Sequence, residues 1–496
     1  MADLEYLKLS KGRRFMFKLR KKLRSLPGKA AGGLKKLVNA AGRFVKKIGS
    51  EAADVFNTFV KGDWKTRASF FIMGFGSMAR GQFLRGLLFF VFQIVFLLYM
   101  LFFGAAYLAK MGTLGTVETA RKGRVTTYGD NSFLILLYGI ITVFFIIAFL
   151  YTWRMNIKQN RISQQILASG KKLRGTKGDL AALADSQFHK TLLALPMLGI
   201  FAFTIIPIIF MVLVAFTNYD YTHQPPGKLF TWVGLSNFKS MLSGGSANYG
   251  DTFSQVLLWT LVWAFFATFL NYFLGMLVAI MINKKGIRLK KMWRTILVMT
   301  IAIPQFVSLL YVSKMFAADG LINSFLIQWG WIAKPLPFWT DGTWARVTII
   351  IINIWIGIPY LMLIATGILM NIPGELLEAA KIDGANAWQS FKSITMPYIL
   401  FITGPSLVNS VVSNINNFNV IWLLSRDVYT TSDQLMANAN ANEVDLLVTW
   451  LYRLTQDQSN YKMASVIGIL VFVVCAILTL VAFSNMVKGD KEESFQ

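Results

Sequence analysis

Eight stretches of the sequence are each apolar over roughly 20 residues, and their length constrains the fold more than any other feature. A bilayer core about 30 Å thick is crossed by about 20 residues of α-helix, which satisfies its backbone polar groups internally. Composition agrees, since 55% of the 496 residues are hydrophobic and 15% are charged. The sequence therefore predicts an all-α membrane protein with eight transmembrane helices, near residues 86–108, 133–153, 192–216, 256–282, 296–316, 347–370, 398–424 and 464–483.

Lysine and arginine in the loops set the expected orientation, because short cytoplasmic loops carry an excess of both. The loop 154–190 holds eight and the loop 283–294 holds six, whereas the loops 218–252 and 317–346 hold two each. Both termini are therefore expected in the cytoplasm. No secretory signal is apparent before the first apolar run, so we expect that run to remain as an anchor.

The segment 1–70 is strongly basic, with eighteen Lys or Arg against five Asp or Glu. Within it, apolar residues recur at the three- and four-residue steps of a helix; they are Leu34, Leu37, Val38, Ala41, Val45 and Ile48. One interpretation is an amphipathic helix on anionic lipid, to which each basic residue contributes about 1 kcal/mol. The other is a disordered basic tail that only enforces orientation. Nucleic-acid binding is not expected, because nothing resembles a base-reading fold.

No catalytic, metal or nucleotide site is expected in this chain. The only cysteine is Cys475, and the two histidines, His189 and His223, are too few and too isolated for a metal cluster. The segment GKKLRGTK at 170–177 lacks the Gly-Lys-Ser/Thr order of a P-loop, and no buried strand precedes it. We therefore predict no cofactor and no enzyme activity in this chain.

The stretch ELLEAAKIDGANAWQSFKSITMPYI at 375–399 is polar, although it lies between two apolar runs. Asp383-Gly384 is a turn-forming pair that can take left-handed dihedral angles. Asn386 with Gln389 three residues later is typical of a helix N-terminus. The sequence predicts a helix, a bend and a second helix at the cytoplasmic surface. Such a pair could couple to a partner, or it could simply pack on lipid.

An ordered pattern in this loop resembles the EAA signature of permease subunits in ABC importers; it comprises Glu378, Ala379, Ala380, Gly384, Ile394 and Pro397. In that family the loop docks into a cleft of the ATP-hydrolysing subunit. The resemblance therefore implies that loop 373–397 transmits motion, as a rigid bent element can. The implied coupling residues are Glu378, Ala379, Ala380, Asp383 and Gly384.

The last 300 residues, roughly, are similar to the larger membrane subunit of maltose- and maltodextrin-type importers. The similarity rests on NIWIGIPYLM at 353–362, SNINNFNVIWLLS at 413–425 and VDLLVTWLYRL at 444–454. It implies two extra N-terminal spans before a six-span core. The expected parts are a basic amphipathic extension (1–70), two spans with a cytoplasmic loop (71–175), the six-span core (176–487) and a cytoplasmic tail (488–496).

Polar and aromatic residues in the sixth and seventh runs suit a sugar, because its hydroxyls need amide partners and its apolar faces pack on aromatic rings. The spacing of three polar residues in the seventh run predicts one shared helix face. In the sixth run, Gly357-Ile358-Pro359 is expected to loosen the helix. The resemblance implies a sugar site at Trp355, Gly357, Tyr360, Ser410, Asn414 and Asn417. The alternative is helix-to-helix hydrogen bonding by the asparagines and core packing by the aromatic residues.

On the outer side, Trp450 and Tyr452 are expected to be exposed. They would contact either a sugar-binding protein or the lipid headgroups, and both possibilities stay open.

The resemblance implies a non-hydrolytic permease subunit of an ATP-driven importer of maltodextrin-type alpha-glucans in a bacterial cell membrane. Expected partners are a second homologous permease, an ATPase dimer that binds ATP and Mg, and an extracellular, lipid-anchored sugar-binding protein. The alternatives are a permease for another oligosaccharide, a membrane scaffold, and an ion-coupled secondary sugar transporter. An ion-coupled carrier is disfavoured, because the central parts of the runs carry no charged residue.

Overall fold

The computed structural model describes residues 43, 49–122, 125–242, 249–284, 286–427, 429 and 431–489. The amphipathic pattern expected at 34–48 lies outside these residues, as does most of the basic extension and the tail after residue 489. In the described part the chain is mainly helical. Its strands are β1 (Ala120–Lys122) and β2 (Val125–Thr127), which pair antiparallel.

Seven helical runs in the described part are long and apolar enough to cross a membrane: Phe83–Lys110, Ser132–Ala168, Phe188–Val214, Tyr249–Asn283, Gly342–Met370, Ala387–Ser425 and Tyr461–Ser484. An eighth candidate is a broken one. It consists of α15 (Lys290–Ala302) and α16 (Gln305–Met315), which bend by 93° around Pro304. The fifth apolar run thus forms a bent pair, since a residue that precedes proline is disfavoured in helical dihedral angles.

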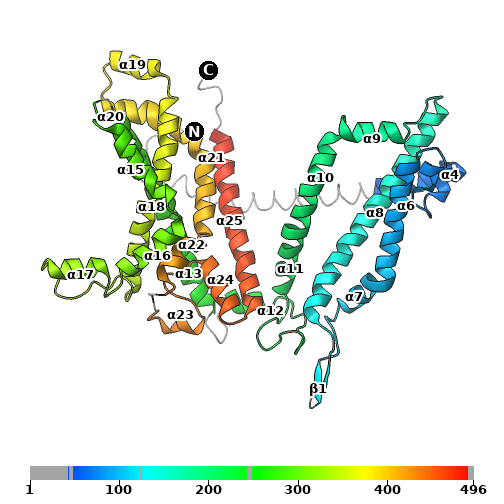
Figure 1. Ribbon diagram of the computed structural model, residues 1–496, viewed down its shortest axis with the longest axis horizontal. Helices are drawn as coiled ribbons and strands as arrows, with labels where there is room; N and C mark the ends of the chain where they lie inside the picture. The colour runs from blue at the N-terminus through cyan, green and yellow to red at the C-terminus, as the bar shows by residue number, and fades with distance from the viewer. Residues whose placement is uncertain are drawn as a thin grey trace, which may run out of the picture. The chain divides into compact units, whose positions relative to one another are not determined.

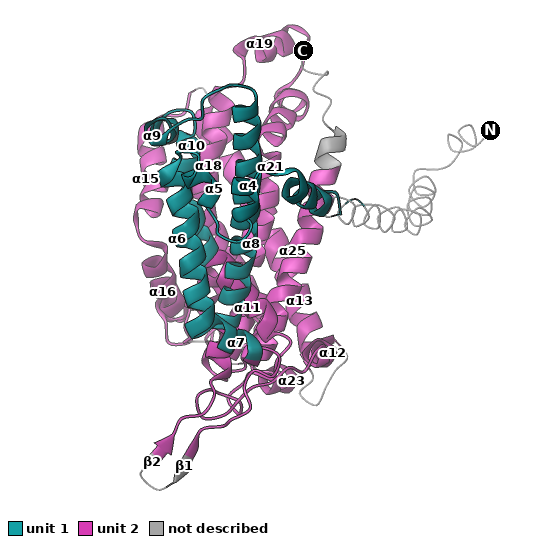
Figure 2. Cartoon of the chain, turned by 90° about the vertical axis from the view of Figure 1, so that its right-hand side faces the viewer, with its two compact units in different colours: residues 1–109, 138–203 teal, residues 110–137, 204–496 magenta. Residues whose placement is uncertain are grey.

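The chain divides into two compact units, shown in Figure 2. Unit 1 comprises residues 1–109 and 138–203, and unit 2 comprises residues 110–137 and 204–496.

Unit 1 is built on two long helices and a folded segment that precedes them. Its elements are a helix over residues 49–61, α4 (Trp64–Ala68), α5 (Phe75–Met78), α6 (Phe83–Tyr99), η1 (Met100–Gly104), α7 (Ala105–Lys110), most of α8 (Ser132–Ala168), α9 (Thr176–Ala184) and α10 (Phe188–Ile200). Aromatic rings join α6 to α8, and the rings of Phe96 and Phe149 stack with centroids 3.9 Å apart. Polar residues of α8 hold the preceding segment: the amide of Asn156 donates to Ser69 O at 2.9 Å, and its oxygen accepts from Gly74 N at 3.0 Å.

Unit 2 is a bundle whose remaining elements are η2 (Phe201–Ile205), α11 (Ile206–Val214), α12 (Ser236–Leu242), α13 (Tyr249–Phe265), η3 (Phe266–Leu270), α14 (Asn271–Asn283), α17 (Leu321–Gln328), α18 (Gly342–Met370), α19 (Gly374–Ile382), α20 (Ala387–Ser390), η4 (Phe391–Thr395), α21 (Met396–Ile415), α22 (Phe418–Ser425), α23 (Gln434–Asn438), α24 (Leu447–Gln456) and α25 (Tyr461–Gly489). Helix α14 packs closely on α18. A Cβ on Gly275 would lie 2.7 Å from Leu361 Cβ, so the small residue allows this approach. Figure 1 shows α12, α23 and α24 at the opposite end of unit 2 from α19.

Trp450 corrects one expectation about the outer side. Its side chain is fully buried, and its indole N–H donates to Ala439 O at 2.9 Å. Tyr452 is 36% exposed. Helix α24 is amphipathic and lays its apolar face, including Trp450, on α25 and α13. Only Tyr452 of this pair is therefore available to a partner or to lipid.

An ion pair holds the loop after α11 to the start of α25. Lys462 Nζ lies 2.6 Å from Asp220 Oδ2, and both side chains are largely shielded from solvent. Burial pushes the pKa of Asp220 upward, but hydrogen bonds from Lys462, Thr222 and His223 outweigh burial, so the pKa lies below its usual range. Asp220 is consequently a carboxylate whenever the protein is near neutral pH.

Candidate functional site

The loop between α18 and α21 forms the expected helix, bend and helix. Helix α19 begins after Pro373, and Gly384 takes a φ of +77° at the bend, a conformation that favours glycine. The predicted N-terminus of the second helix is confirmed: Asn386 Oδ1 accepts from Gln389 N, and Gln389 Oε1 accepts from Asn386 N, both at 2.8 Å. Helix α20 then continues through η4 into α21.

This loop presents an apolar surface to solvent. The exposed fractions are 86% for Ile382, 68% for Trp388 and 48% for Leu376. Figure 1 shows α19 beyond the ends of α15, α18 and α21. The predicted coupling residues Glu378, Ala379, Asp383 and Gly384 are exposed as well, and Ala380 is half-buried. Clustered exposed apolar side chains mark an interaction surface.

A hollow of about 280 Å³ lies where the bent pair α15 and α16 faces α18. Two of the predicted sugar residues, Trp355 and Tyr360, line it and are 49% and 60% exposed. Its other lining residues are Thr300, Ile301, Ile303, Pro304, Gln305, Ser308 and Ile356. The hollow thus combines aromatic faces with hydroxyl and amide groups, the chemistry that a sugar needs.

Sequence reasoning missed the contribution of α15 and α16 to this hollow. The signal was Pro304, in the fifth apolar run, followed directly by Gln305. By contrast, α18 continues as one helix through Gly357 and Pro359, so these residues do not end it. The break lies in the neighbouring pair, where Pro304 stands between two helices.

The asparagines of the seventh run make contacts within the protein. Asn414 Nδ2 donates to Thr268 Oγ1 at 3.0 Å, and Asn414 Oδ1 accepts from Asn417 Nδ2 at 3.3 Å. Asn417 Oδ1 in turn accepts from Val420 N at 3.3 Å and begins α22. These amides join η3, α21 and α22, as expected from the alternative in which the asparagines form hydrogen bonds between helices. Each side-chain amide also has a second N–H that these bonds do not use.

Two positions differ from the expected geometry. Ser410 and Asn414 lie on α21, but Asn417 follows the end of that helix at Ile415. The three residues therefore do not share one helix face, because Asn417 caps a new helix. Gly357 packs against α14, where an added Cβ would lie 2.4 Å from Asn271 Nδ2. An added side chain would therefore displace the amide of Asn271.

Among the residues that the structure describes, no group of three or more His, Cys, Asp or Glu side chains could hold a metal ion.

Comparison with known proteins decides the family. Residues 271–488 match the family described as binding-protein-dependent transport system inner membrane component. The chain is 33% identical to the maltodextrin transport system permease protein MalC of Streptococcus pneumoniae, over 85% of this chain and 95% of that one. The chain belongs to the ABC importer permeases.

Two further relatives of this permease come from Bacillus subtilis. The maltodextrin transport system permease protein MdxF is 34% identical, over 85% of this chain and 95% of MdxF. The galactooligosaccharides transport system permease protein GanP is 33% identical, over 85% of this chain and 97% of GanP. All three relatives are transport permeases and none is an enzyme. The chain is accordingly a multi-pass permease subunit of the cell membrane.

Proposed function

We propose that this permease carries maltodextrin-type alpha-glucans across the cell membrane, as the larger permease subunit of its importer. The observation that carries the proposal is the similarity, along 85% of the chain, to two permeases named for maltodextrin transport. The aromatic and polar hollow beside Trp355 and Tyr360 supports it. A second candidate cargo is a galacto-oligosaccharide, because GanP is as similar.

In this proposal the bent pair α15 and α16 counts as one span, which gives eight spans with both termini in the cytoplasm. The basic ends support this orientation: Lys290, Lys291 and Arg294 begin α15, and α15 begins at the same end of unit 2 as the coupling loop (Figure 1). We retain the division into a basic extension (1–70), two N-terminal spans (71–175), a six-span core (176–487) and a tail (488–496).

The sugar would bind near the middle of the membrane. Trp355 and Tyr360 offer ring faces to the pyranose, and Ser410, Asn414 and Asn417 offer hydrogen bonds to its hydroxyls. Gly357 would contribute by letting α18 pack closely on Asn271 of α14. Because Asn414 and Asn417 already bond to Thr268 and to each other, their amides would be held in fixed orientations when the sugar arrives.

The loop 373–397 would couple the membrane helices to a partner ATPase dimer, in which ATP and Mg are bound and hydrolysed. Glu378, Ala379, Ala380, Asp383 and Gly384 are the proposed contact residues. The exposed surface of Ile382 and Trp388 supports a partner at this place. Because α20 continues into α21, a push on the loop would reach Asn414 along one nearly continuous helical run.

A second homologous permease and an extracellular, lipid-anchored sugar-binding protein would complete the importer. Helix α24, which carries the partly exposed Tyr452, lies toward the end of unit 2 opposite α19 (Figure 1), the proposed extracellular end, where the binding protein would dock.

Uptake in cells that produce the complete importer tests the cargo. We expect labelled maltotriose to accumulate, and we expect excess unlabelled maltodextrin to compete while excess galacto-oligosaccharide does not. Competition by the galacto-oligosaccharide alone would favour the second candidate. Absence of any uptake, with all subunits assembled, would contradict the proposed function.

A further inference from the structure

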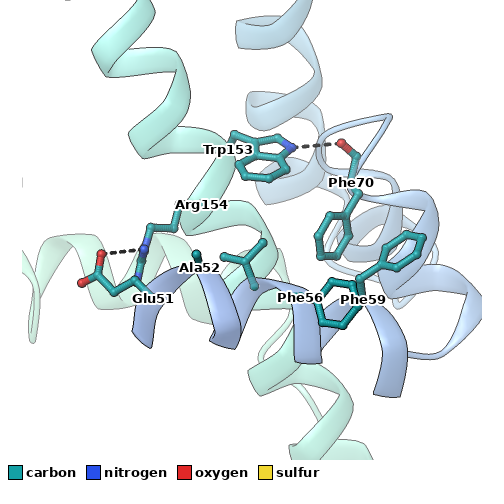
Figure 3. A pocket seen from close by; sticks show the side chains of 8 residues that line it. Glu51, Ala52, Phe56, Phe59, Phe70, Trp153 and Arg154 are labelled. Atoms are coloured by element: carbon teal, nitrogen blue, oxygen red, sulfur yellow. Dashed lines mark hydrogen bonds and ion pairs between the residues drawn. The ribbon is translucent and has the colours of Figure 1, made fainter. Parts of the chain in front are cut away.

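Unit 1 contains an apolar hollow of about 510 Å³ that the transport function leaves unused. Figure 3 shows Phe56 and Phe59 of the helix 49–61 on one side, and Phe70 and Trp153 on the other. The charged side chains of Glu51 and Arg154 stand at its rim. A hollow with walls of this kind gives water few hydrogen-bond partners, so it suits an apolar ligand.

Polar contacts fix the walls of this hollow, and the rings of Phe59 and Phe70 meet at one end of it with centroids 5.1 Å apart. Trp153 Nε1 donates to Phe70 O at 2.9 Å, which fixes the ring of Trp153 against the loop. Arg154 Nη1 lies 2.7 Å from Glu51 Oε2 at the start of the helix 49–61. Three residues later on that helix, just under one turn, Asp54 pairs with Arg161, so α8 holds the helix at a second place. These contacts hold the helix 49–61 in a defined position beside α8.

The hollow lies at the level of the membrane surface. Trp153 is the last residue of the apolar part of α8, and Arg154 is the first basic residue of the loop 154–190. Tryptophan prefers the boundary between hydrocarbon and headgroups, and arginine extends its guanidinium toward the headgroups. The hollow therefore opens where lipid tails meet phosphates, on the side with the basic loop.

The surface around the hollow is continuous with the lipid-facing surface of α6. Phe71 O accepts from Gln93 Nε2 at 2.8 Å, and Gln93 lies well inside the first apolar run. Phe71 is 72% exposed and Ile72 is 46% exposed. On the neighbouring elements Phe56 is 67% exposed and Trp64 is 64% exposed. Side chains of this kind beside a membrane span are expected to contact lipid.

Charge at the rim complements an anionic headgroup. Lys158 lies one helical turn after Arg154 on α8 and is exposed. A guanidinium has five N–H donors, so Arg154 can bond to a phosphate while it keeps its contact with Glu51. Basic residues this close to an anionic leaflet contribute about 1 kcal/mol each.

We propose that residues 49–82 form an anchor in the headgroup layer and that the hollow binds one phospholipid. An acyl chain lies between Phe56 and Trp153, and the phosphate lies beside Arg154. The anchor would fix the end of α8 relative to the membrane surface. This site shares no residue with the proposed sugar site or with the loop 373–397. The lipid proposal therefore does not depend on whether the proposed cargo is correct.

Photo-crosslinking of the full chain in lipid nanodiscs tests the proposal. The photo-reactive amino acid p-benzoylphenylalanine replaces Phe56 in one variant and Asn57 in the control. Asn57 is exposed on the same helix but lines a separate hollow with Lys61 and Gln164. We expect an adduct with the mass of one phospholipid, several-fold more abundant at position 56 than at position 57. Equal adducts at both positions, or a cross-link from position 56 to a protein chain, would overturn the lipid site.

Nanodiscs with equal amounts of phosphatidylcholine and phosphatidylglycerol test the headgroup. We expect the adduct at position 56 to be enriched in phosphatidylglycerol, and the enrichment to fall when Lys158 is changed to Gln, since Lys158 makes no contact that holds the helix 49–61. An adduct with the two lipids in their bulk ratio would overturn the proposed contact with phosphate and bases.

Discussion

Asn414 is a polar residue in a membrane span whose hydrogen bonds join parts of the protein to one another. Its amide bonds to Thr268 and Asn417, and its backbone oxygen accepts from the indole of Trp263 at 3.1 Å. Such bonds satisfy polar groups that lipid cannot satisfy. A sugar would then meet amides whose positions are already fixed, and binding would cost little side-chain entropy.

Replacement of Asn414 tests whether it also contacts the cargo. For Asn414→Ala we expect maltotriose uptake to fall about fivefold or more, because one hydrogen bond contributes about 1 kcal/mol. Asn416→Ala is the matched control, since Asn416 is exposed and bonds only to Val412 O and Cys475 Sγ among the described residues. Uptake that is unchanged in Asn414→Ala, with the importer still assembled, would remove Asn414 from the site.

The pair of Asp220 and Lys462 should stabilise the contact between the loop after α11 and the start of α25. Lys462→Met leaves a shielded carboxylate without its cation, so we expect a loss of about 2 kcal/mol in the free energy of unfolding near neutral pH. Lys228→Met is the control, because Lys228 forms an exposed pair with Glu118 at 3.3 Å. In Lys228→Met the loss of free energy of unfolding should stay below about 1 kcal/mol. Thermal unfolding in detergent measures both.

The same pair predicts a pH dependence. The folded-state pKa of Asp220 is depressed, so its contribution is complete above the ordinary carboxyl pKa near 4 and disappears as pH falls through the lower folded-state value. The difference between wild type and Lys462→Met should therefore shrink below about pH 4. A difference that stays constant as the pH falls would show that lost packing, not charge, explains the variant.

At the scale of elements, the bend between α15 and α16 shapes the hollow beside α18. Pro304 lacks a backbone N–H and restricts Ile303, which takes extended dihedral angles (φ −84°, ψ 128°). Two other prolines, Pro359 and Pro405, remain inside α18 and α21. A proline in an apolar run is therefore not sufficient for a break.

Pro304→Ala should relax the bend and narrow the hollow beside Trp355. Spin labels at Thr295→Cys and Lys314→Cys, in a chain with Cys475→Ser, report the distance between the two arms. We expect a longer or broader distance distribution in Pro304→Ala, together with weaker maltotriose uptake. Pro405→Ala should leave this distance unchanged. An unaltered distance in Pro304→Ala would mean that tertiary packing, and not the proline, determines the bend.

At the scale of the whole molecule, the sequence predicted the membrane spans well and the surfaces poorly. The first expected run, 86–108, lies within the observed Phe83–Lys110, because apolar length is a property of the segment alone. The exposure of Trp450 was misjudged, since periodicity reveals that a helix has an apolar face but not what covers it. The anchor before α6 was not predicted, because it depends on distant polar residues such as Asn156.

The coupling loop was predicted most completely. Its turn and its N-terminal cap depend on neighbours in the sequence, namely Gly384 and the pair Asn386 and Gln389. For the proposed sugar site, the sequence indicated Trp355 and Tyr360 but not the hollow that they line, because residues of α15 and α16 reach α18 only in the tertiary structure.

The central claim is that this permease couples sugar to ATP hydrolysis in a partner through the bend at Gly384. The most direct measurement is the ATP hydrolysis of the complete importer in lipid, with and without maltotriose. Gly384→Ala strains the positive φ by about 1 kcal/mol, whereas Gly374→Ala meets open space at the start of α19. We predict that maltotriose stimulates hydrolysis in wild type and Gly374→Ala, and that stimulation is lost in Gly384→Ala. Hydrolysis that ignores maltotriose in the wild-type importer, or stimulation that persists in Gly384→Ala, would contradict this account.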